Sequence, residues 1–272
     1  MSQRLEQSLQ QCALEHALLC SYHEQIQNLL RYVINGLLFE KDPPAFFGSK
    51  VRATLDTLWV CLKHTYGEQH ETLKKWDSQR LSGELLTIEE LLRSDIEAAL
   101  VNDPATTDPL EVIFCYPGFK AIAAHRIAHV FYKHAIPLLP RMIAELAHEQ
   151  TGIDIHPGAQ IDSHFFIDHG TGVVIGETAI IGRKVTLYQG VTLGAKRFYR
   201  HEDGTVVKGQ PRHPILEDGI TVYSGATILG RIRIGQGSVI GGNVWLTESV
   251  PPKSRITQQH FLSSYFTDGD GI

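Results

Sequence analysis

In the second half of the chain, one aliphatic side chain recurs at every sixth position. A first run reads Ile155, Ile161, Ile167 and Val173, and a second, shifted by two residues, reads Ile175, Ile181, Leu187 and Leu193. After a break, the pattern resumes as Leu216, Val222, Ile228, Ile234, Ile240 and Leu246. A period of six fits neither an α-helix nor a hairpin and is the hexapeptide signature of a β-helix. We therefore predict a left-handed parallel β-helix over residues 151–250, with each aliphatic side chain inside a narrow prism.

The two-residue shift between these runs falls within Asp168-His-Gly-Thr-Gly172. Glycine adopts backbone conformations that other residues avoid, so Gly170 and Gly172 permit an irregular corner there. We predict that this corner pushes His169 out of the wall of the prism. The alternative is an irregular corner with a surface histidine that has no chemical role.

Apolar positions in the first 150 residues are spaced by three and four, which predicts amphipathic helices. The expected helices cover residues 2–39, 48–66, 87–100, 119–134 and 137–150, with another start at Asp108-Pro109. Asp42-Pro43-Pro44 is expected to end the first helix. Thr87 and Glu90 form an expected capping box, and Glu111 is expected to close a second one begun by Asp108.

The predicted fold class is therefore α+β in two parts. An all-α domain covers residues 1–150 and the β-helix covers 151–250. The hexad pattern stops at residue 250, and the polar remainder, residues 251–272, is expected to be a flexible tail.

Residues 195–214 interrupt the hexads and predict a long loop that leaves the solenoid. Its charged side chains are mostly basic: Lys196, Arg197, Arg200, His201, Lys208, Arg212 and His213 against Glu202 and Asp203. Loops that leave solenoids often line binding sites. A basic loop suits a ligand with phosphate groups, such as coenzyme A. The alternative is a solvated surface loop.

Composition places the chain among globular proteins, with 43% hydrophobic and 20% charged residues among 272. The net charge of −5 argues against a nucleic-acid partner. No run reaches the roughly 18 apolar residues of a membrane span, and the N-terminus lacks the apolar core of a signal peptide. We therefore expect a cytoplasmic protein with no nucleic-acid or membrane partner. The four cysteines have no Cys-x-x-Cys spacing and predict neither a disulfide framework nor a zinc knuckle.

His125 and His129 are four residues apart on one predicted helix, a spacing that can bind a metal ion. No glutamate completes a His-Glu-x-x-His arrangement, so we interpret both as packed histidines and expect no metal. Asp103 lies in a predicted loop of the helical half. It is the carboxylate we expect to reach out of that half toward a site.

Several motifs together resemble the serine O-acetyltransferase family. They are Asp154-Ile-His-Pro157, Asp168-His-Gly-Thr-Gly-Val-Val-Ile-Gly-Glu-Thr-Ala179, Gln189-Gly-Val-Thr-Leu-Gly194 and Arg212-His-Pro214, with Arg93-Ser-Asp-Ile96, Asp103-Pro104, Gly118-Phe119 and His125-Arg-Ile127 upstream, and Asp268-Gly-Asp-Gly-Ile272 at the end. The resemblance covers residues 90–250 well and the first 80 only loosely.

The resemblance implies transfer of an acetyl group from acetyl-CoA to the hydroxyl of L-serine in cysteine biosynthesis, giving O-acetyl-L-serine and CoA. A hydroxyl is a weak nucleophile until a base takes its proton, and histidine, with an ordinary pKa of about 6.5, suits that role. By resemblance His169 is the general base and Asp154 orients it. The residues implied to hold serine are Asp103, Asp168, Arg212 and His213. Transfer is implied to be direct, in a ternary complex without an acyl-enzyme.

The resemblance also makes acetyl-CoA the co-substrate, with no metal. The cofactor is expected along the prism, where small residues allow backbone contact and the basic loop begins: Gly194, Lys196, Ser224, Gly225, Gly241 and Gly242. The loop after Gly194 is longer than the usual glycine-rich loop of the family. Cysteine is an expected feedback inhibitor, because it resembles serine.

The resemblance to the family implies that the C-terminal Ile272 binds O-acetylserine sulfhydrylase. It also implies a homotrimer, or a hexamer made of two trimers, with active sites between prisms. Three alternatives remain open. One is a hexapeptide O-acetyltransferase for a sugar or xenobiotic hydroxyl. Another is a zinc protein resembling γ-carbonic anhydrase, using His164 and His169. The third is a non-catalytic scaffold that presents Ile272.

Overall fold

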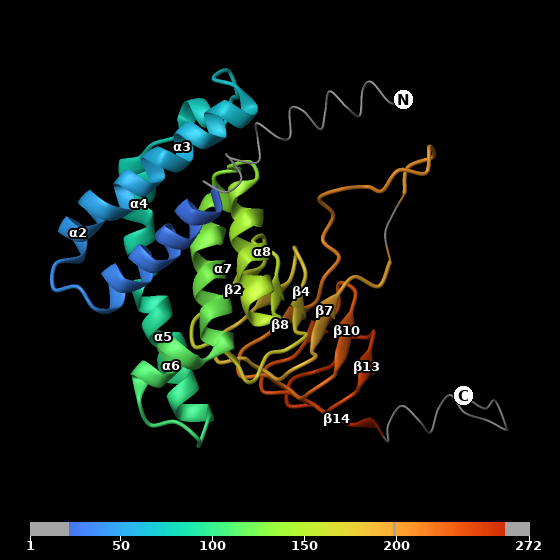
Figure 1. The fold of residues 1–272 in the computed structure, drawn as a ribbon. Coiled ribbons are helices and arrows are strands. Elements are labelled where there is room, and N and C mark those ends of the chain that lie inside the picture. The colour runs from blue at the N-terminus through green and yellow to red at the C-terminus, as the bar shows by residue number, and fades with distance from the viewer. Residues whose placement is uncertain (1–21, 198–199, 259–272) are drawn as a thin grey trace. The chain divides into compact units, whose positions relative to one another are not determined.

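The computed structural model describes residues 22–197 and 200–258 (Figure 1). The N-terminal part of the first expected helix and residues 259–272 of the expected tail, with Ile272, lie outside these ranges. Residues 251–258 of that tail are described, and Arg255–Ile256 forms a strand that pairs with Val239–Ile240 of the β-helix. Contacts divide the described chain into two compact units. The first comprises the residues up to Glu89 together with Val130–Met142, and the second comprises Glu90–His129 together with the residues from Ile143 onward. The predicted boundary at residue 150 divides the chain by type of structure instead, and stays a prediction.

The first unit is helical, as the three- and four-residue spacing predicts. It contains a helix at residues 22–38, α2 (Pro43–Phe46), a π-helical turn (Phe47–Val51), α3 (Arg52–Tyr66), a 3₁₀ turn (Leu73–Lys75) and α4 (Ser78–Leu86). The sequence Asp42-Pro43-Pro44 was expected to end the first helix, and in the structure it also begins α2. The Asp42 side chain accepts a hydrogen bond from the Ala45 N–H, and proline suits the first turn because its missing N–H is not needed there.

Helix α4 was not expected from the sequence, and it changes the interpretation of Thr87. The Asp77 side chain caps the start of α4 by accepting hydrogen bonds from the N–H groups of Gln79 and Arg80. Thr87 is the C-cap of α4, and its hydroxyl donates to the Glu84 carbonyl over 2.7 Å. The predicted capping box at Thr87 is therefore wrong, and the next helix, α5 (Glu89–Asn102), begins two residues later.

Three further helices follow: α6 (Pro109–Cys115), α7 (Pro117–Lys133) and α8 (Leu139–Thr151). Asp108 caps α6 as predicted, with its side chain accepting a hydrogen bond from the Leu110 N–H. Glu111 does not close a capping box, because its carboxylate accepts a hydrogen bond from the Thr106 hydroxyl over 2.7 Å. The predicted helix breaks at Asp103 and Asp108 are confirmed.

The second half of the described chain is a parallel β-helix. Its fourteen described strands are β1 (Asp154–Ile155), β2 (Gln160–Ile161), β3 (Phe166–Ile167), β4 (Val174–Ile175), β5 (Ile180–Ile181), β6 (Thr186–Leu187), β7 (Thr192–Gly194), β8 (Ile215–Leu216), β9 (Thr221–Val222), β10 (Thr227–Leu229), β11 (Arg233–Ile234), β12 (Val239–Ile240), β13 (Trp245–Leu246) and β14 (Arg255–Ile256). They form three parallel sheets, ordered β1-β4-β7-β10-β13, β2-β5-β8-β11 and β3-β6-β9-β12-β14. From β1 to β13 every third strand joins the same sheet, so three hexads make one coil. The last strand, β14, pairs with β12 instead. The left-handed sense of the coil stays a prediction.

The aliphatic positions of the hexads fill the prism. All of them are buried except Ile161, which is half-buried. Residues 195–197 and 200–214 leave the solenoid between β7 and β8, as the interrupted pattern predicts (Figure 1).

The strand register explains the two-residue shift in the hexads. Asp154 pairs with Val174, a step of 20 residues, whereas Val174 pairs with Thr192, a step of 18. The first coil is therefore two residues longer than the second. The extra length lies at residues 168–172, where His169, Gly170 and Gly172 all have positive φ angles, of 57°, 86° and 76°. The predicted irregular corner is confirmed.

Candidate active site

His169 lies at the irregular corner between β3 and β4. Its φ of 57° is one that residues other than glycine seldom adopt, and its side chain is 70% exposed. The corner therefore turns His169 out of the wall of the prism, as predicted. The neighbouring Gly170 packs closely underneath, since a Cβ there would lie 2.4 Å from Cδ1 of Ile153.

Two carboxylates accompany His169 at this edge. Oδ1 of Asp168 is 3.8 Å from Nδ1 of His169. Asp103 follows the end of α5, near enough to His169 for the histidine to influence the pKa of the Asp103 carboxyl. Hydrogen bonds from the Tyr116 hydroxyl and the Ala105 N–H, helped by His169, hold the pKa of the Asp103 carboxyl below its usual value. The structure thus brings Asp103, Asp168 and His169 together.

The same edge of the prism continues along the coils below His169. Tyr188, after β6, stacks on Tyr223, after β9, with ring centroids 5.1 Å apart. Burial and the charge of Asp168 raise the pKa of Tyr188. Of the expected cofactor-binding residues, Ser224 and Gly225 follow Tyr223 directly, and Gly241 and Gly242 occupy the matching corner of the next coil. The Asn243 N–H donates to the Ser224 carbonyl over 2.9 Å, so these corners stack on one another.

Arg212 and His213 form a second group at the exit of the long loop. The Thr178 hydroxyl accepts hydrogen bonds from both of their backbone N–H groups, over 2.9 and 3.1 Å. Arg231 donates through Nη1 to the carbonyls of Thr178 and His213, over 2.6 and 3.0 Å. The guanidinium of Arg212 contacts Glu177, with Nη2 and Oε2 2.6 Å apart. These contacts fix the backbone and the side chain of this group.

The ring of His213 is neutral and packed. The residue is 6% exposed, and burial, followed by the charge of Arg212, lowers its pKa to about 4. The Thr178 N–H donates to Nδ1 of His213 over 3.0 Å, which requires an unprotonated Nδ1 and leaves the ring proton on Nε2. Gly176 makes room for this ring, because a Cβ at Gly176 would lie 2.1 Å from it.

Within one chain, these two groups occupy different edges of the prism. His169 precedes β4, whereas the Arg212 group packs at residues 176–178, after β4. The strand path from residue 173 to residue 176 alone spans roughly 10 Å at the rise per residue of a β-strand. No hydrogen bond or ion pair joins the two groups in the described ranges. The single chain therefore carries two separate groups of candidate site residues, which we call half-sites.

Asp154 begins β1, in the coil before His169. Within the described chain its side chain makes no hydrogen bond or ion pair, and the carboxylate paired with His169 is that of Asp168. The orienting role implied for Asp154 stays a prediction.

A basic pocket of about 230 Å³ lies beside the second group, where the long loop leaves β7. All of the charged residues that line it are cationic: Lys196, Arg197, Arg212 and Arg231. Gly194 ends β7, two residues before Lys196. The expected cofactor-binding residues are thus divided between this pocket and the edge below His169.

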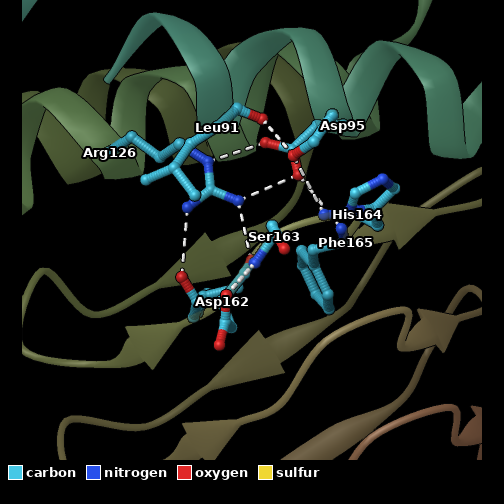
Figure 2. A network of polar contacts seen from close by, with 9 residues as sticks. Leu91, Asp95, Arg126, Asp162, Ser163, His164 and Phe165 are labelled. Atoms are coloured by element: carbon cyan, nitrogen blue, oxygen red, sulfur yellow. Dashed lines mark hydrogen bonds and ion pairs between the residues drawn. The ribbon is translucent and has the colours of Figure 1, made fainter. Parts of the chain in front are cut away.

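A buried ion pair anchors the helices that carry Asp103 to the coil that precedes His169 (Figure 2). Arg126, in α7, donates to both carboxylate oxygens of Asp95, in α5, over 2.6 and 2.9 Å. It also donates to the carbonyls of Ile161 and Asp162, while Asp95 accepts from the Phe165 N–H. Both side chains of the pair are at most 3% exposed. Burial raises the pKa of Asp95, and Arg126 opposes that rise.

Glycine also brings α7 against the solenoid. A Cβ at Gly118 would lie 2.1 Å from the carbonyl oxygen of Ile167, which is the residue before Asp168. Two motifs that carried the family resemblance, around Asp95 and around Arg126, therefore have a structural role beneath the site.

The paired histidines of α7 are packed, as interpreted from the sequence. His125 is buried, and burial lowers its pKa well below the usual value. His129 has its Nδ1 2.8 Å from the Pro157 carbonyl oxygen. Across the described residues, no group of three or more histidine, cysteine or acidic side chains is arranged to hold a metal ion. No helix within those ranges is long and apolar enough to cross a membrane.

Sequence reasoning missed four residues that support the site: Tyr116, Glu177, Thr178 and Arg231. Glu177 and Thr178 lie inside a motif quoted for the resemblance, and Tyr116 lies two residues before another, Gly118-Phe119. Their roles depend on hydrogen bonds to residues 13 to 53 positions away. No local pattern reports such contacts, and Arg231 carried no sequence signal at all.

Comparisons with known proteins identify the family. No protein-family model matches the chain. A plasmid serine acetyltransferase of Synechococcus elongatus is 56% identical over 195 residues, which are 72% of this chain and 61% of that protein. The serine acetyltransferase of Bacillus subtilis is 45% identical over 166 residues, covering 61% of this chain and 72% of the relative.

Solved structures agree with the sequence relatives. Serine acetyltransferase 1 of Entamoeba histolytica, in complex with L-cysteine, has 35% identity and a TM-score of 0.75, covering 85% of both chains. The Neisseria gonorrhoeae serine acetyltransferase, in complex with serine, has 27% identity and a TM-score of 0.58, covering 85% of this chain and 93% of that one. The fold is thus that of β-helical acetyltransferases with an N-terminal helical region. The chain belongs to the serine acetyltransferase family.

Proposed function

We propose that the protein is a serine O-acetyltransferase that converts L-serine and acetyl-CoA to O-acetyl-L-serine and CoA. The observation that carries this proposal is the outward-turned His169, placed with Asp103 and Asp168 at one edge of the prism. An exposed histidine beside two carboxylates suits a substrate that has both a hydroxyl and an ammonium group. Membership of the serine acetyltransferase family indicates that the reaction at these residues is acetyl transfer to the hydroxyl of serine. The matched part of the chain spans 61% of the first Synechococcus relative, so the activity is a proposal for the whole protein.

His169 acts as the general base in this mechanism. It takes the proton of the serine hydroxyl as that oxygen attacks the acetyl carbonyl carbon. The carbon–sulfur bond then breaks, and the proton on His169 passes to the CoA sulfur. Both substrates are bound together, so no acyl-enzyme forms. Asp154 is proposed to orient His169 in the assembled enzyme.

Serine is held by groups of opposite charge. Asp103 and Asp168 bind its ammonium group, and Arg212, beside His213, offers its guanidinium to the carboxylate. The complex of the Neisseria relative with serine supports this substrate. The Entamoeba complex with L-cysteine supports cysteine as a ligand, and we propose that cysteine inhibits by binding at the serine site. Because one chain separates these groups on two edges, we propose that prisms pair in a trimer, or in a hexamer of two trimers, to complete each site.

Acetyl-CoA is proposed to bind between the basic pocket and the edge below His169. The cations around Lys196 suit its phosphates, and Gly194 lies nearby. Its pantetheine arm is proposed to contact the backbone at corners of the prism that have small side chains or none: Ser224, Gly225, Gly241 and Gly242. We also propose a cytoplasmic location and binding of O-acetylserine sulfhydrylase by Ile272, which lies outside the described residues.

A thiol-release assay with acetyl-CoA and L-serine tests the proposal. Purified protein should release CoA only when serine is present. His169→Ala should lower kcat by at least roughly a hundredfold, the usual contribution of a general base. His64→Ala, which alters an exposed histidine of α3, is the matched control and should retain full activity.

Three other outcomes would contradict the proposal. Turnover of a sugar or xenobiotic hydroxyl in place of serine would favour another hexapeptide O-acetyltransferase. Stoichiometric zinc with carbonic anhydrase activity would favour a zinc protein. Absence of turnover with every acceptor would favour a scaffold.

A further inference from the structure

Tyr116 makes a short contact with a carboxylate of the candidate site. Its hydroxyl donates to Oδ2 of Asp103 over 2.6 Å, while the Ala105 N–H donates to Oδ1 over 2.8 Å. Both oxygens of Asp103 therefore have a defined partner from the protein. One lone pair on each oxygen remains available to a ligand, because a carboxylate oxygen accepts about two hydrogen bonds.

The tyrosine itself is held at two points. Tyr116 stands between α6 and α7, and its N–H donates to the Val112 carbonyl over 3.2 Å. The bond from its hydroxyl to Asp103 is the second point at which the residue is held. Burial and the bond to Asp103 raise the pKa of Tyr116 to about 12, so its hydroxyl stays protonated and remains a donor.

These contacts connect rigid elements to a loop carboxylate. Asp103 lies just beyond the end of α5, where a free side chain would sample several rotamers and lose conformational entropy on binding a ligand. The Tyr116 hydroxyl and the Ala105 N–H restrict that freedom before any ligand arrives. Preorganisation of this kind raises affinity because less ordering remains to be done on binding.

We propose that Tyr116 is a positioning residue, which holds the Asp103 carboxylate in the orientation that receives the ammonium group of the substrate. This inference rests on the proposed function, because Asp103 was assigned to the ammonium group there. Tyr116 acts through Asp103 and takes no part in proton transfer. It should therefore influence the binding of amine-bearing substrates rather than the chemical step.

Tyr116→Phe removes only the hydroxyl and retains the ring. The KM for L-serine should rise roughly tenfold, the effect of losing one hydrogen bond to a charged group. The kcat at saturating serine and the KM for acetyl-CoA should stay close to wild type. Calorimetric titration with L-serine should show the same loss of affinity without turnover. Tyr66→Phe is the control, since the Tyr66 hydroxyl makes no hydrogen bond within the described chain.

A double-mutant cycle locates the effect. In an Asp103→Ala background, the further change Tyr116→Phe should leave the affinity for serine unaltered, because its partner is absent. The analogue 3-hydroxypropanoate has the hydroxyl and the carboxylate but no ammonium group. Wild-type preference for serine over this analogue should fall roughly tenfold in Tyr116→Phe.

Other results would overturn the inference. It fails if Tyr116→Phe lowers kcat alone, weakens both acceptors equally, or acts as strongly without Asp103 as with it. It also fails if Asp103→Ala binds serine as wild type does. Failure of the proposed function is distinct, since wild-type protein would then release no CoA with serine.

Discussion

The ring of His213 shows how one absent side chain can shape a site. The ring lies against Gly176, where a Cβ would be 2.1 Å away, and the Thr178 N–H holds Nδ1 in place. Gly176→Ala should therefore displace the ring. We expect a loss of about 1–3 kcal/mol in unfolding free energy, the usual cost of overpacking, together with a higher KM for serine. Denaturant titration and steady-state kinetics measure the two effects.

Gly83→Ala is the matched control for this change. Gly83 lies in α4 with open space around its Cα. An alanine there should raise stability by about 0.5–1 kcal/mol, because glycine is a poor helix former. Equal effects of the two substitutions would contradict the packing argument at Gly176.

The neutral state of His213 predicts how stability depends on pH. Its folded pKa, about 4, lies below the ordinary 6.5. Between these values the unfolded chain binds a proton that the folded chain does not, so stability falls as pH drops from 6.5 to 4 and levels off below. Above pH 6.5, the neutral state of His213 contributes on the order of 3 kcal/mol to the free energy of unfolding. His213→Gln should remove it, and the free-energy difference from wild type should change across this window. A constant difference would show that His213 is not held neutral.

Single residues differ in how far the sequence reveals them. The exposure of His169 could be predicted, because the two-residue shift in the hexads is a local consequence of a longer coil. The neutrality of His213 and the contact between Tyr116 and Asp103 could not, since they depend on partners that only the coiling of the chain brings near. The orienting role of Asp154 also depends on a partner that is distant in the sequence. It came from the family resemblance alone and stays a prediction.

At the scale of elements, the pair Asp95–Arg126 connects α5 and α7 to the first coil. Arg126→Met would leave the Asp95 carboxylate buried without its countercharge (Figure 2). We expect a loss of about 3–5 kcal/mol in unfolding free energy, the usual result of removing one partner of a buried pair. Thermal and denaturant unfolding would measure it. Activity should fall as well, because α5 carries the Asp103 loop.

Two further variants make this test specific. Asp95→Leu combined with Arg126→Met should recover much of the lost stability, since the unpaired charge is then gone. Arg233→Met breaks an exposed pair with Glu217, whose distance is 2.9 Å, and should cost at most about 1 kcal/mol. If Arg126→Met were as mild as Arg233→Met, the pair would not anchor these helices.

Elements built from repeats were predicted more fully than elements that depend on caps. Each hexad places the same local requirement on the chain, so the β-helix and the burial of its aliphatic side chains could be predicted from their positions alone. Thr87 was misassigned because a threonine at a helix junction can end one helix as well as begin the next. In this chain its hydroxyl donates backward to Glu84. The cap of α4 is Asp77, which the apolar spacing did not reveal.

At the scale of the whole molecule, the site depends on where the coils place its two half-sites. One half-site lies at the corner that precedes β4 and contains His169 and Asp168, with Asp103 nearby. The other lies at the corner that follows β4, where Arg212 and His213 pack on Thr178. A small amino acid cannot reach both edges of one prism, because its charged groups are only a few ångströms apart. Identical subunits that pack around a symmetry axis bring different edges of neighbouring copies together. The separation of the half-sites is thus a physical argument for a site shared between two chains.

Mixing two inactive variants tests this argument. His169→Ala removes the base from one half-site, and Arg212→Ala removes the carboxylate partner from the other, so each homo-oligomer should be inactive. In oligomers co-expressed from both genes, a shared site is intact only where the Arg212→Ala chain supplies His169 and the His169→Ala chain supplies Arg212. Random assembly of equal amounts gives this combination at about a quarter of the sites. Acetyl transfer should therefore return to about a quarter of the wild-type rate. Mass spectrometry of intact complexes confirms the mixing. Mixed oligomers with no more activity than either parent would place the whole site within one chain, and a substrate-induced change of the Arg212 loop would then have to close the gap.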